Sequence, residues 1–209
     1  NTKIVAVLPV MGIVAPDTKA YALLAKSIAE LKQATYVNKI FLPTTDCKLA
    51  EFFGVLWLDR LAIPNADNLG IDQFMKKCLE VIELVGDYPD ALLYVNYDYL
   101  NRPENIFDEL IIDAQYKGYD TVFPAYLDYG HYWLKNAHED YQQTDTSMQK
   151  RSEREPIYQA LYGLGCLTST DIIRRGKITG GKIGILPIDD FKSTLRLRDF
   201  DPMSNQEPR

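Results

Sequence analysis

Asp98 is the acidic residue best placed for chemistry in this sequence. It follows the apolar segment 91–95, which has the length and composition of a buried strand. A carboxylate just beyond the carboxyl end of such a strand can hold a magnesium ion that bridges phosphate groups. An Asx turn leaving the strand is an equally weighted alternative. We therefore take Asp98 as the candidate catalytic residue and magnesium ligand.

A second group of charged residues lies near the end of the chain. Arg196 and Arg198 are two residues apart, so on a strand they would face the same side and could grip a carboxylate or a phosphate. Asp199 and Asp201 follow directly and are candidate magnesium ligands, with the acidic pair 189–190 as a substitute. A solvated basic strand edge would also explain the two arginines.

The composition limits the class of protein. The 209 residues carry a formal net charge of −6, which disfavours a nucleic-acid groove or an anionic membrane surface as partner. With 46% hydrophobic residues and no long apolar run, we expect a cytoplasmic protein with one domain over residues 1–201 and a polar tail over 202–209. The three cysteines have no CxxC spacing, so we expect reduced, structural thiols.

Apolar runs of strand length alternate with longer segments of helical period. The sequence favours strands near residues 3–8, 39–42, 55–58, 91–95, 121–125 and 183–186. It favours helices near residues 17–33, 48–53, 72–85 and 103–118, with a short one after 170–171. This alternation predicts an α/β fold with a doubly wound, mainly parallel sheet. Ligands of such sheets bind at the carboxyl ends of the strands.

Capping residues set the expected helix boundaries. Asp17 is the expected N-cap of the first helix, and the turn 44–46 is the expected cap of the second. Pro103 is expected in the first turn of the helix that ends near Gly118, because proline is tolerated there.

Residues 127–156 break the regular pattern. The segment is rich in tyrosine, and it contains Trp133 and two histidines, His131 and His138, whose spacing does not suit a metal site. An irregular segment of this length inside a domain is usually functional or belongs to an interface. Its aromatic content favours an arm that packs on a second subunit, and hence a homodimer. A solvated flap is the alternative.

The order of these pieces resembles the cytidylyltransferases that make CMP-activated sialic acids and related sugar acids. Segment 42–51 resembles the strand, Ser-Thr-Asp turn and helix of that family, and segment 93–106 is similar to its Leu-Gln-Pro-Thr-Ser-Pro-Leu-Arg and Pro-Glu-Asp-Ile stretch. Segments 154–163 and 181–183 are similar to the strand that follows its dimerisation arm. The resemblance implies a nucleotide-diphospho-sugar transferase-like fold, a nucleoside triphosphate and a sugar acid as ligands, Mg²⁺ as cofactor, and a homodimer.

The resemblance also assigns residues to sites. The candidate nucleotide-binding residues are Pro9, Met11, Gly12, Lys19 and Asn96. Lys19 lies at the expected helix N-terminus and is equally well read as a solvated residue, and Asn96 could bind the base only after a shift of register. The candidate sugar-acid residues are Asn101, Arg102, Tyr158, Arg196 and Arg198. The candidate metal ligands are Asp98 with Asp199 and Asp201, which lie just beyond the position of the family's acidic pair and would replace it after a shift of register.

The chain departs from the family pattern where the chemistry would occur. The loop 9–16 contains no Lys or Arg, and Met11 stands where the family has an arginine. Val95 stands at the position of the glutamine that reads cytosine, and segment 196–198 is Arg-Leu-Arg where the family has Asp-Ile-Asp. Each lost charge-assisted hydrogen bond to a triphosphate removes on the order of 1.5–3 kcal/mol.

Three functions are compatible with this pattern. The first is a divergent cytidylyltransferase that transfers CMP from CTP to a sugar acid such as a sialic-acid-like nonulosonate. The second is a catalytically degenerate homodimer with a binding or structural role. The third is another sugar-nucleotide transferase on the same fold, because one scaffold hosts many chemistries.

Overall fold

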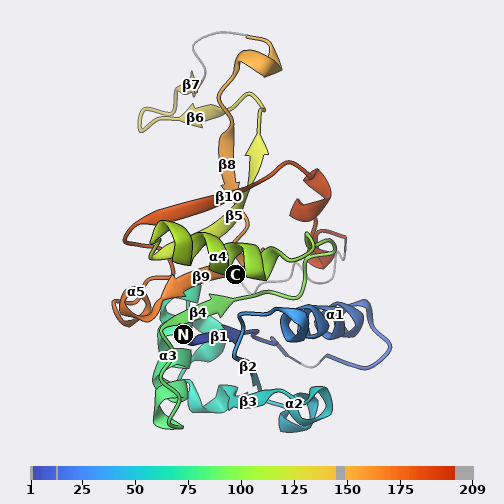
Figure 1. Cartoon of the computed structure of the whole chain (residues 1–209). Helices are drawn as coiled ribbons and strands as arrows, with labels where there is room; N and C mark the ends of the chain where they lie inside the picture. Colours follow the sequence, from blue (N-terminus) through green and yellow to red (C-terminus); the bar gives the residue numbers. More distant parts are fainter. Residues whose placement is uncertain (1, 13, 145–148, 201–209) are drawn as a thin grey trace.

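The computed structural model describes residues 2–12, 14–144 and 149–200. Within these ranges the main sheet contains eight strands, and a separate pair of strands forms a small hairpin (Figure 1). Along the main sheet the order is β10-β5-β9-β4-β1-β2-β3, and β8 pairs with β5 beyond this path. None of the helices in the described part of the chain is both long and apolar enough to span a membrane.

The N-terminal half of the sheet is parallel, as the sequence predicted. Strand β1 pairs in parallel with both β2 and β4, and β2 pairs in parallel with β3. Strand β10 pairs in parallel with β5 at the other end of the sheet. The bounds are β1 Ile4–Val7, β2 Lys39–Thr44, β3 Leu56–Asp59, β4 Ala91–Tyr94, β5 Thr121–Asp128 and β10 Ile183–Ile188.

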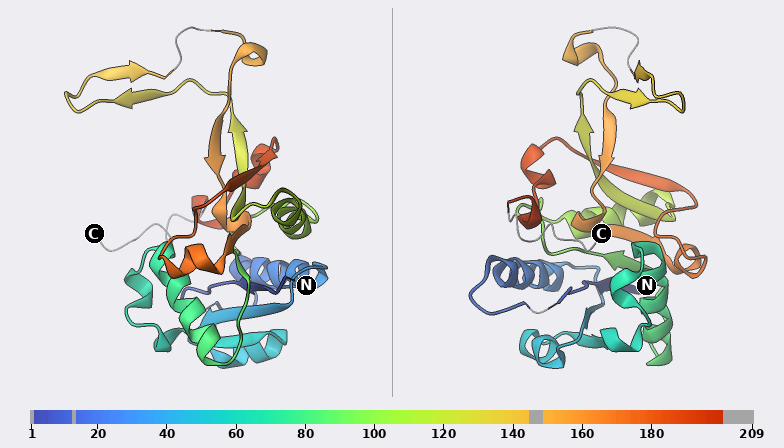
Figure 2. Two further views of the ribbon diagram at one scale, coloured as in Figure 1. Left: turned by 60° about the vertical axis from the view of Figure 1, so that its left-hand side comes forward. Right: turned by 180° about the vertical axis from the view of Figure 1, so that it is seen from behind.

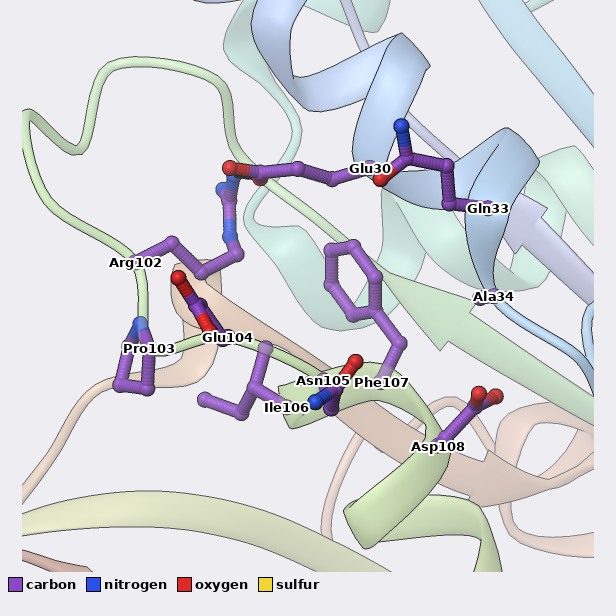
Figure 3. A pocket seen from close by; sticks show the side chains of 10 residues that line it. All are labelled: Glu30, Gln33, Ala34, Arg102, Pro103, Glu104, Asn105, Ile106, Phe107 and Asp108. Carbon is purple, nitrogen blue, oxygen red and sulfur yellow. Dashed lines mark hydrogen bonds and ion pairs between the residues drawn. The ribbon is translucent and has the colours of Figure 1, made fainter.

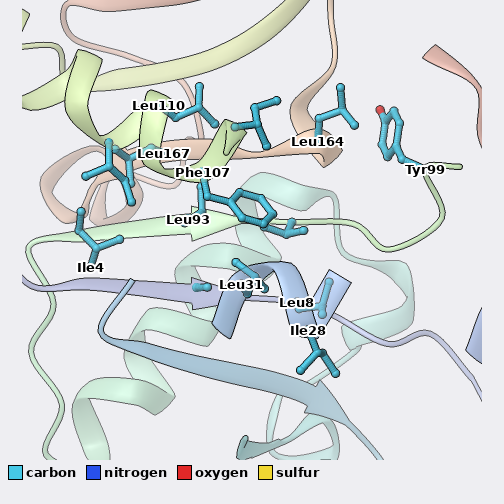
Figure 4. Close-up of a cluster of buried hydrophobic side chains, with 14 of the residues drawn as sticks. Ile4, Leu8, Ile28, Leu31, Leu93, Tyr99, Phe107, Leu110, Leu164 and Leu167 are labelled. Atoms are coloured by element: carbon cyan, nitrogen blue, oxygen red, sulfur yellow. The ribbon is translucent and has the colours of Figure 1, made fainter. Parts of the chain in front are cut away.

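Helices cover both faces of this sheet. Helices α1, α2 and α4 contribute to one hydrophobic cluster, part of which is drawn in Figure 4, and α3 and α5 contribute to the other. Strand β1 is buried on both faces: Ile4 and Ala6 belong to the first cluster, whereas Val5 and Val7 belong to the second. The bounds are α1 Lys19–Gln33, α2 Cys47–Phe53, α3 Ile71–Leu84, α4 Ile106–Lys117 and α5 Thr170–Arg174.

One central strand was not predicted. Strand β9, Cys166–Ser169, lies between β4 and β5 and is antiparallel to both. The strand has four residues and ends directly at α5, so no long apolar run marks it in the sequence. It joins two parallel blocks into one sheet, and the sheet is therefore mixed but mainly parallel.

The described part of segment 127–156, which was predicted as irregular, contains short regular elements. Strand β5 continues to Asp128 and pairs with β8, Ile157–Ala160, to form a two-stranded stem. At its end lies the hairpin of β6, Trp133–Lys135, and β7, Tyr141–Gln143. All views show this arm projecting away from the helices that cover the sheet (Figures 1 and 2).

The helix caps correct two expectations. The N-cap of α1 is Thr18, whose hydroxyl accepts the Tyr21 N–H at 3.1 Å, whereas Asp17 has a positive φ of 68°. Pro103 precedes α4 instead of lying in its first turn, and Asn105 is the N-cap. The cap of α2 was predicted correctly, since Asp46 accepts the Lys48 N–H. Gly118 ends α4 in the left-handed conformation, as expected.

Candidate functional site

A cavity of about 620 Å³ lies at the carboxyl ends of β1 and β4. This is the edge of the sheet at which ligands of doubly wound folds bind. Its walls come from the loop after β1, the loop after β4, the start of α3, and the C-terminal segment that contains the 3₁₀ turn η6, Leu197–Asp199. Among the predicted residues it brings together Pro9, Met11, Asn96, Asp98 and Arg198.

Arg60 is a cation in the wall of this cavity that the sequence analysis missed. It opens the 3₁₀ turn η1, Arg60–Ala62, directly after β3, and only 4% of its surface is exposed. The side chain of Asp59 caps this turn by accepting the Leu61 N–H, which fixes the exit from β3. A clear signal was available, because Arg60 follows a predicted parallel strand at the edge where ligands bind.

The guanidinium of Arg60 is only partly satisfied. Its Nε and Nη2 atoms donate to Asp67 Oδ1 at 3.1 and 3.0 Å, and its Cζ atom lies 4.9 Å from the ring centroid of Phe74. Within the described residues, the buried Nη1 atom has no hydrogen-bond partner. A buried donor without a partner costs about 1–3 kcal/mol, and more when it is charged. Such a group is a strong candidate for binding an anion.

Met11 lies against the same guanidinium. Its sulfur is 2.6 Å from Nη2 of Arg60, although more than half of the Met11 side chain is exposed. The cation of this region comes from the end of β3.

Asp98 is paired with both arginines of the C-terminal segment. Arg196 Nε lies 3.2 Å from Asp98 Oδ1, and Arg198 Nε lies 3.8 Å from Asp98 Oδ2. The predicted strand for these arginines is wrong, because Arg198 belongs to η6 and Arg196 forms only an isolated antiparallel bridge with Tyr99. The two side chains nevertheless converge on one carboxylate.

Burial shifts the ionisation of this region. Burial raises the pKa of Asp98 above its ordinary value, although the guanidinium of Arg196 acts in the opposite direction. Burial also raises the pKa of Tyr94 to about 12, so this phenol in the cavity wall stays protonated at neutral pH. Tyr94 therefore keeps a hydroxyl donor in the cavity wall at neutral pH.

The carboxylates do not form a magnesium site in this arrangement. Both oxygens of Asp98 face guanidinium groups, and Asp199 accepts the backbone N–H of Arg196 at 2.9 Å. Across the part of the chain that the structure describes, no group of three or more His, Cys, Asp or Glu side chains could hold a metal ion. Asp201 lies outside the described residues. The donor set does not fit the predicted Mg²⁺ at Asp98.

The loop after β1 contributes little charge to the cavity. Gly12 has a positive φ of 67°, which glycine adopts without strain. Lys19 is the first residue of α1 and lines a neighbouring cavity of about 520 Å³, together with Leu197 and Phe200. Lys19 thus lines a cavity next to the candidate site and not the candidate site itself.

Asn96 shapes the loop after β4. Its side-chain oxygen accepts the Asp98 N–H at 3.0 Å. An Asx turn therefore follows β4, but the side chain of Asn96 forms it, and not that of Asp98 as the alternative predicted. The backbone N–H of Asn96 donates to Gly163, and its carbonyl accepts Arg102 Nη2 at 2.8 Å. Several hydrogen bonds therefore fix the loop that carries Asp98.

Arg102 lines another pocket and connects helix α1 to the loops around it. It lines a cavity of about 320 Å³, where its Nη1 donates to Glu30 at 2.7 Å (Figure 3). Its other donors reach Ser27, the carbonyl of Leu164 and the carbonyl of Asn96. The structure thus separates Arg102 from the candidate site and gives it a positioning role.

The two remaining predicted substrate residues also lie outside the cavity lining. Asn101 donates to Asp190 at 3.3 Å, and Asp190 itself caps the 3₁₀ turn Phe191–Thr194. Tyr158 lies on β8 in the stem of the arm, opposite Leu127, with half of its surface exposed. Neither contributes to the walls of the 620 Å³ cavity.

Comparisons with solved structures identify the fold. The CMP:2-keto-3-deoxy-manno-octonic acid synthetase complexed with CTP matches with a TM-score of 0.58 and 9% identity, over 90% of this chain and 91% of that chain. A 4-diphosphocytidyl-2C-methyl-D-erythritol synthase matches with a TM-score of 0.61 and 13% identity, over 94% and 93%. The corresponding synthase from Anaerococcus prevotii matches with a TM-score of 0.59 and 9% identity, over 93% and 92%.

The sequence itself matches no known family model and no curated protein. At identities of 9–13% the structural likeness shows the fold alone. The predicted nucleotidyltransferase-like α/β fold is therefore confirmed.

Proposed function

We propose that this chain is a divergent cytidylyltransferase-like protein that binds CTP in the 620 Å³ cavity and transfers CMP to a sugar acid. The observation that carries the proposal is the buried guanidinium of Arg60, which lines this cavity and has an unpartnered Nη1. The cavity lies at the carboxyl ends of β1 and β4, where this fold places its ligands. The names of the structural neighbours, which include a synthetase complexed with CTP, support the choice of nucleotide.

The chemistry would be an in-line displacement. A hydroxyl oxygen of the sugar acid forms a new bond to the α-phosphorus of CTP, the bond to the β-phosphate bridge breaks, and pyrophosphate leaves. The hydroxyl proton passes to water. Such a step needs positioning and charge stabilisation more than covalent help from the protein. Arg60 would stabilise the charge on the phosphates, and Asn96 and Tyr94 offer polar groups to the base.

The proposal is tested by calorimetric titration of CTP into the wild type, Arg60→Gln and Arg174→Gln. Arg174 on α5 is a matched control, because this arginine also forms ion pairs, with Glu83 and Asp171, but does not line the cavity. We expect Arg60→Gln to weaken CTP binding by about tenfold or more, since one charge-assisted hydrogen bond contributes about 1.5–3 kcal/mol. Equal affinities for the two variants would contradict the assignment.

A second assay separates transfer from binding. Pyrophosphate release is measured with CTP and a panel of sugar acids that includes a nonulosonate. The catalytically degenerate alternative predicts CTP binding without release. The pairing of Asp98 with two arginines favours that alternative, because it removes the acid that the family would use for its metal.

A homodimer through the arm is part of the same proposal. The hairpin exposes Trp133, Leu134 and Tyr141, each with at least 59% of its surface accessible. Exposed aromatic residues on a projecting element are typical of subunit interfaces.

A further inference from the structure

We infer that the phosphate groups of the ligand bind in this cavity without a divalent cation, because two guanidinium groups occupy the carboxylate that a metal ion would use. The inference rests on the proposed function. It concerns the pairing of Asp98 with Arg196 and Arg198, which lie about a hundred positions later in the chain.

The pairing uses both carboxylate oxygens. Arg196 Nε faces Oδ1 at 3.2 Å, and Arg198 Nε faces Oδ2 at 3.8 Å. The Asp98 side chain is only 17% exposed, so water screens these contacts less than it would at the surface. A metal ion could reach Asp98 only by displacing a guanidinium from a partly buried carboxylate.

Arg196 is fixed by more than this ion pair. Its guanidinium lies 4.8 Å from the ring centroid of Tyr99, and its backbone forms an antiparallel bridge with the same residue. On either side of this bridge the Leu100 N–H donates to Leu195 at 3.0 Å and the Leu197 N–H donates to Asp98 at 2.7 Å. The C-terminal segment is thus tied to the loop after β4, and its arginines are held in place before a ligand arrives.

The charges favour a ligand anion over a metal cation. Arg198 has a half-exposed side chain that lines the same cavity as Arg60. A divalent cation beside Asp98 would be repelled by the guanidinium groups of Arg196 and Arg198. A phosphate group instead gains from guanidinium forks, which match its oxygens in a bidentate manner. The structure therefore supplies positive charge from the protein where a bound metal would otherwise supply it.

The inference is tested by titrating CMP and CTP into the protein in buffer with EDTA and in buffer with magnesium. We expect dissociation constants that agree within about twofold between the two buffers, because the charge comes from the protein. Arg198→Gln should weaken binding by about tenfold in both buffers, and Arg174→Gln should not change it.

The outcomes separate this inference from the proposed function. Binding of CTP that tightens by about tenfold or more with magnesium would overturn the inference and leave the proposed function standing. No binding of either nucleotide in either buffer would overturn both.

Asp98→Asn gives a second test with opposite expectations. If Asp98 only pairs with arginines, Asp98→Asn changes nucleotide affinity by the same factor in EDTA and in magnesium, since no metal ion takes part. If Asp98 holds a metal ion, the same variant loses affinity in magnesium and not in EDTA. Circular dichroism on the variant confirms that it is folded, and the second result would overturn the inference.

Discussion

The sulfur of Met11 lies 2.6 Å from Nη2 of Arg60, so an exposed thioether covers a guanidinium that is buried in the cavity wall. A ligand anion that binds Nη2 of Arg60 as well as the unpartnered Nη1 must move the Met11 side chain aside. Methionine is unbranched and flexible, and such a movement is easy for it. Met11 therefore influences how readily the candidate site accepts its ligand.

Met11→Ala should increase affinity for CTP by a few-fold, because the anion no longer displaces the thioether from Arg60. The measurement is calorimetric titration of the variant and the wild type. Leu61→Ala is the matched control, since Leu61 follows Arg60 and 78% of its surface is exposed. A loss of affinity in Met11→Ala alone would show that the thioether contacts the ligand itself.

Arg102→Gln should lower the free energy of unfolding by about 3 kcal/mol, because it leaves buried partners of a broken ion pair without their donors. Arg102 joins Glu30 and Ser27 of α1 to the carbonyls of Asn96 and Leu164. Urea denaturation measures the change, with Arg174→Gln as the surface control. A change below about 1 kcal/mol, the usual scale for an exposed pair, would contradict the positioning role.

Asp87→Asn should destabilise the protein at neutral pH and should have little effect in acid. Hydrogen bonds from Lys3 and Lys39 lower the pKa of Asp87 below its ordinary value of 3.8 in the folded state. Its stabilising contribution is therefore present above the unfolded pKa and is lost as the pH falls through the folded pKa.

Chemical denaturation of wild type and Asp87→Asn across the acidic range checks this dependence. The exposed Glu104 provides the control variant Glu104→Gln. A difference between wild type and Asp87→Asn that persists unchanged in strong acid would contradict the assignment.

Deletion of residues 129–150 should convert a homodimer into a monomer. Light scattering coupled to size-exclusion chromatography measures the mass of the wild type and the deletion. The paired substitution Trp133→Ser and Leu134→Ser should weaken the dimer without removing the hairpin. Tyr116→Ser is the control, because Tyr116 is an exposed aromatic residue on α4. An unchanged mass for the deletion would overturn the dimer prediction.

The parallel part of the fold could be predicted from the sequence because its strands and helices have clear local patterns of apolar residues. Strand β1 is a continuous apolar run, and α3 presents an apolar stripe at helical spacing. Strand β9 was missed because it is short and its pairing with β4 is set by tertiary contacts. Local patterns carry no information of that kind.

The candidate site was predictable only in part. Asp98 and Arg198 were identified as chemically capable, but their contact joins residues about a hundred positions apart. Arg60 was not predicted because the resemblance places the phosphate-binding cations in the loop after β1, whereas the fold supplies one from the end of β3. The chemical capability of single residues could be predicted from the sequence, but the contacts between them could not, because the fold brings them together.

The position of β9 also delays completion of the sheet during synthesis. Strand β4 emerges from the ribosome well before β9, yet β9 is its antiparallel neighbour in the finished sheet. Until β9 arrives, the nascent N-terminal block of β1 to β4 presents an open strand edge, and such edges promote association between chains. A truncated product that ends before residue 166 should therefore be prone to aggregate, even though β1 to β4 are all present.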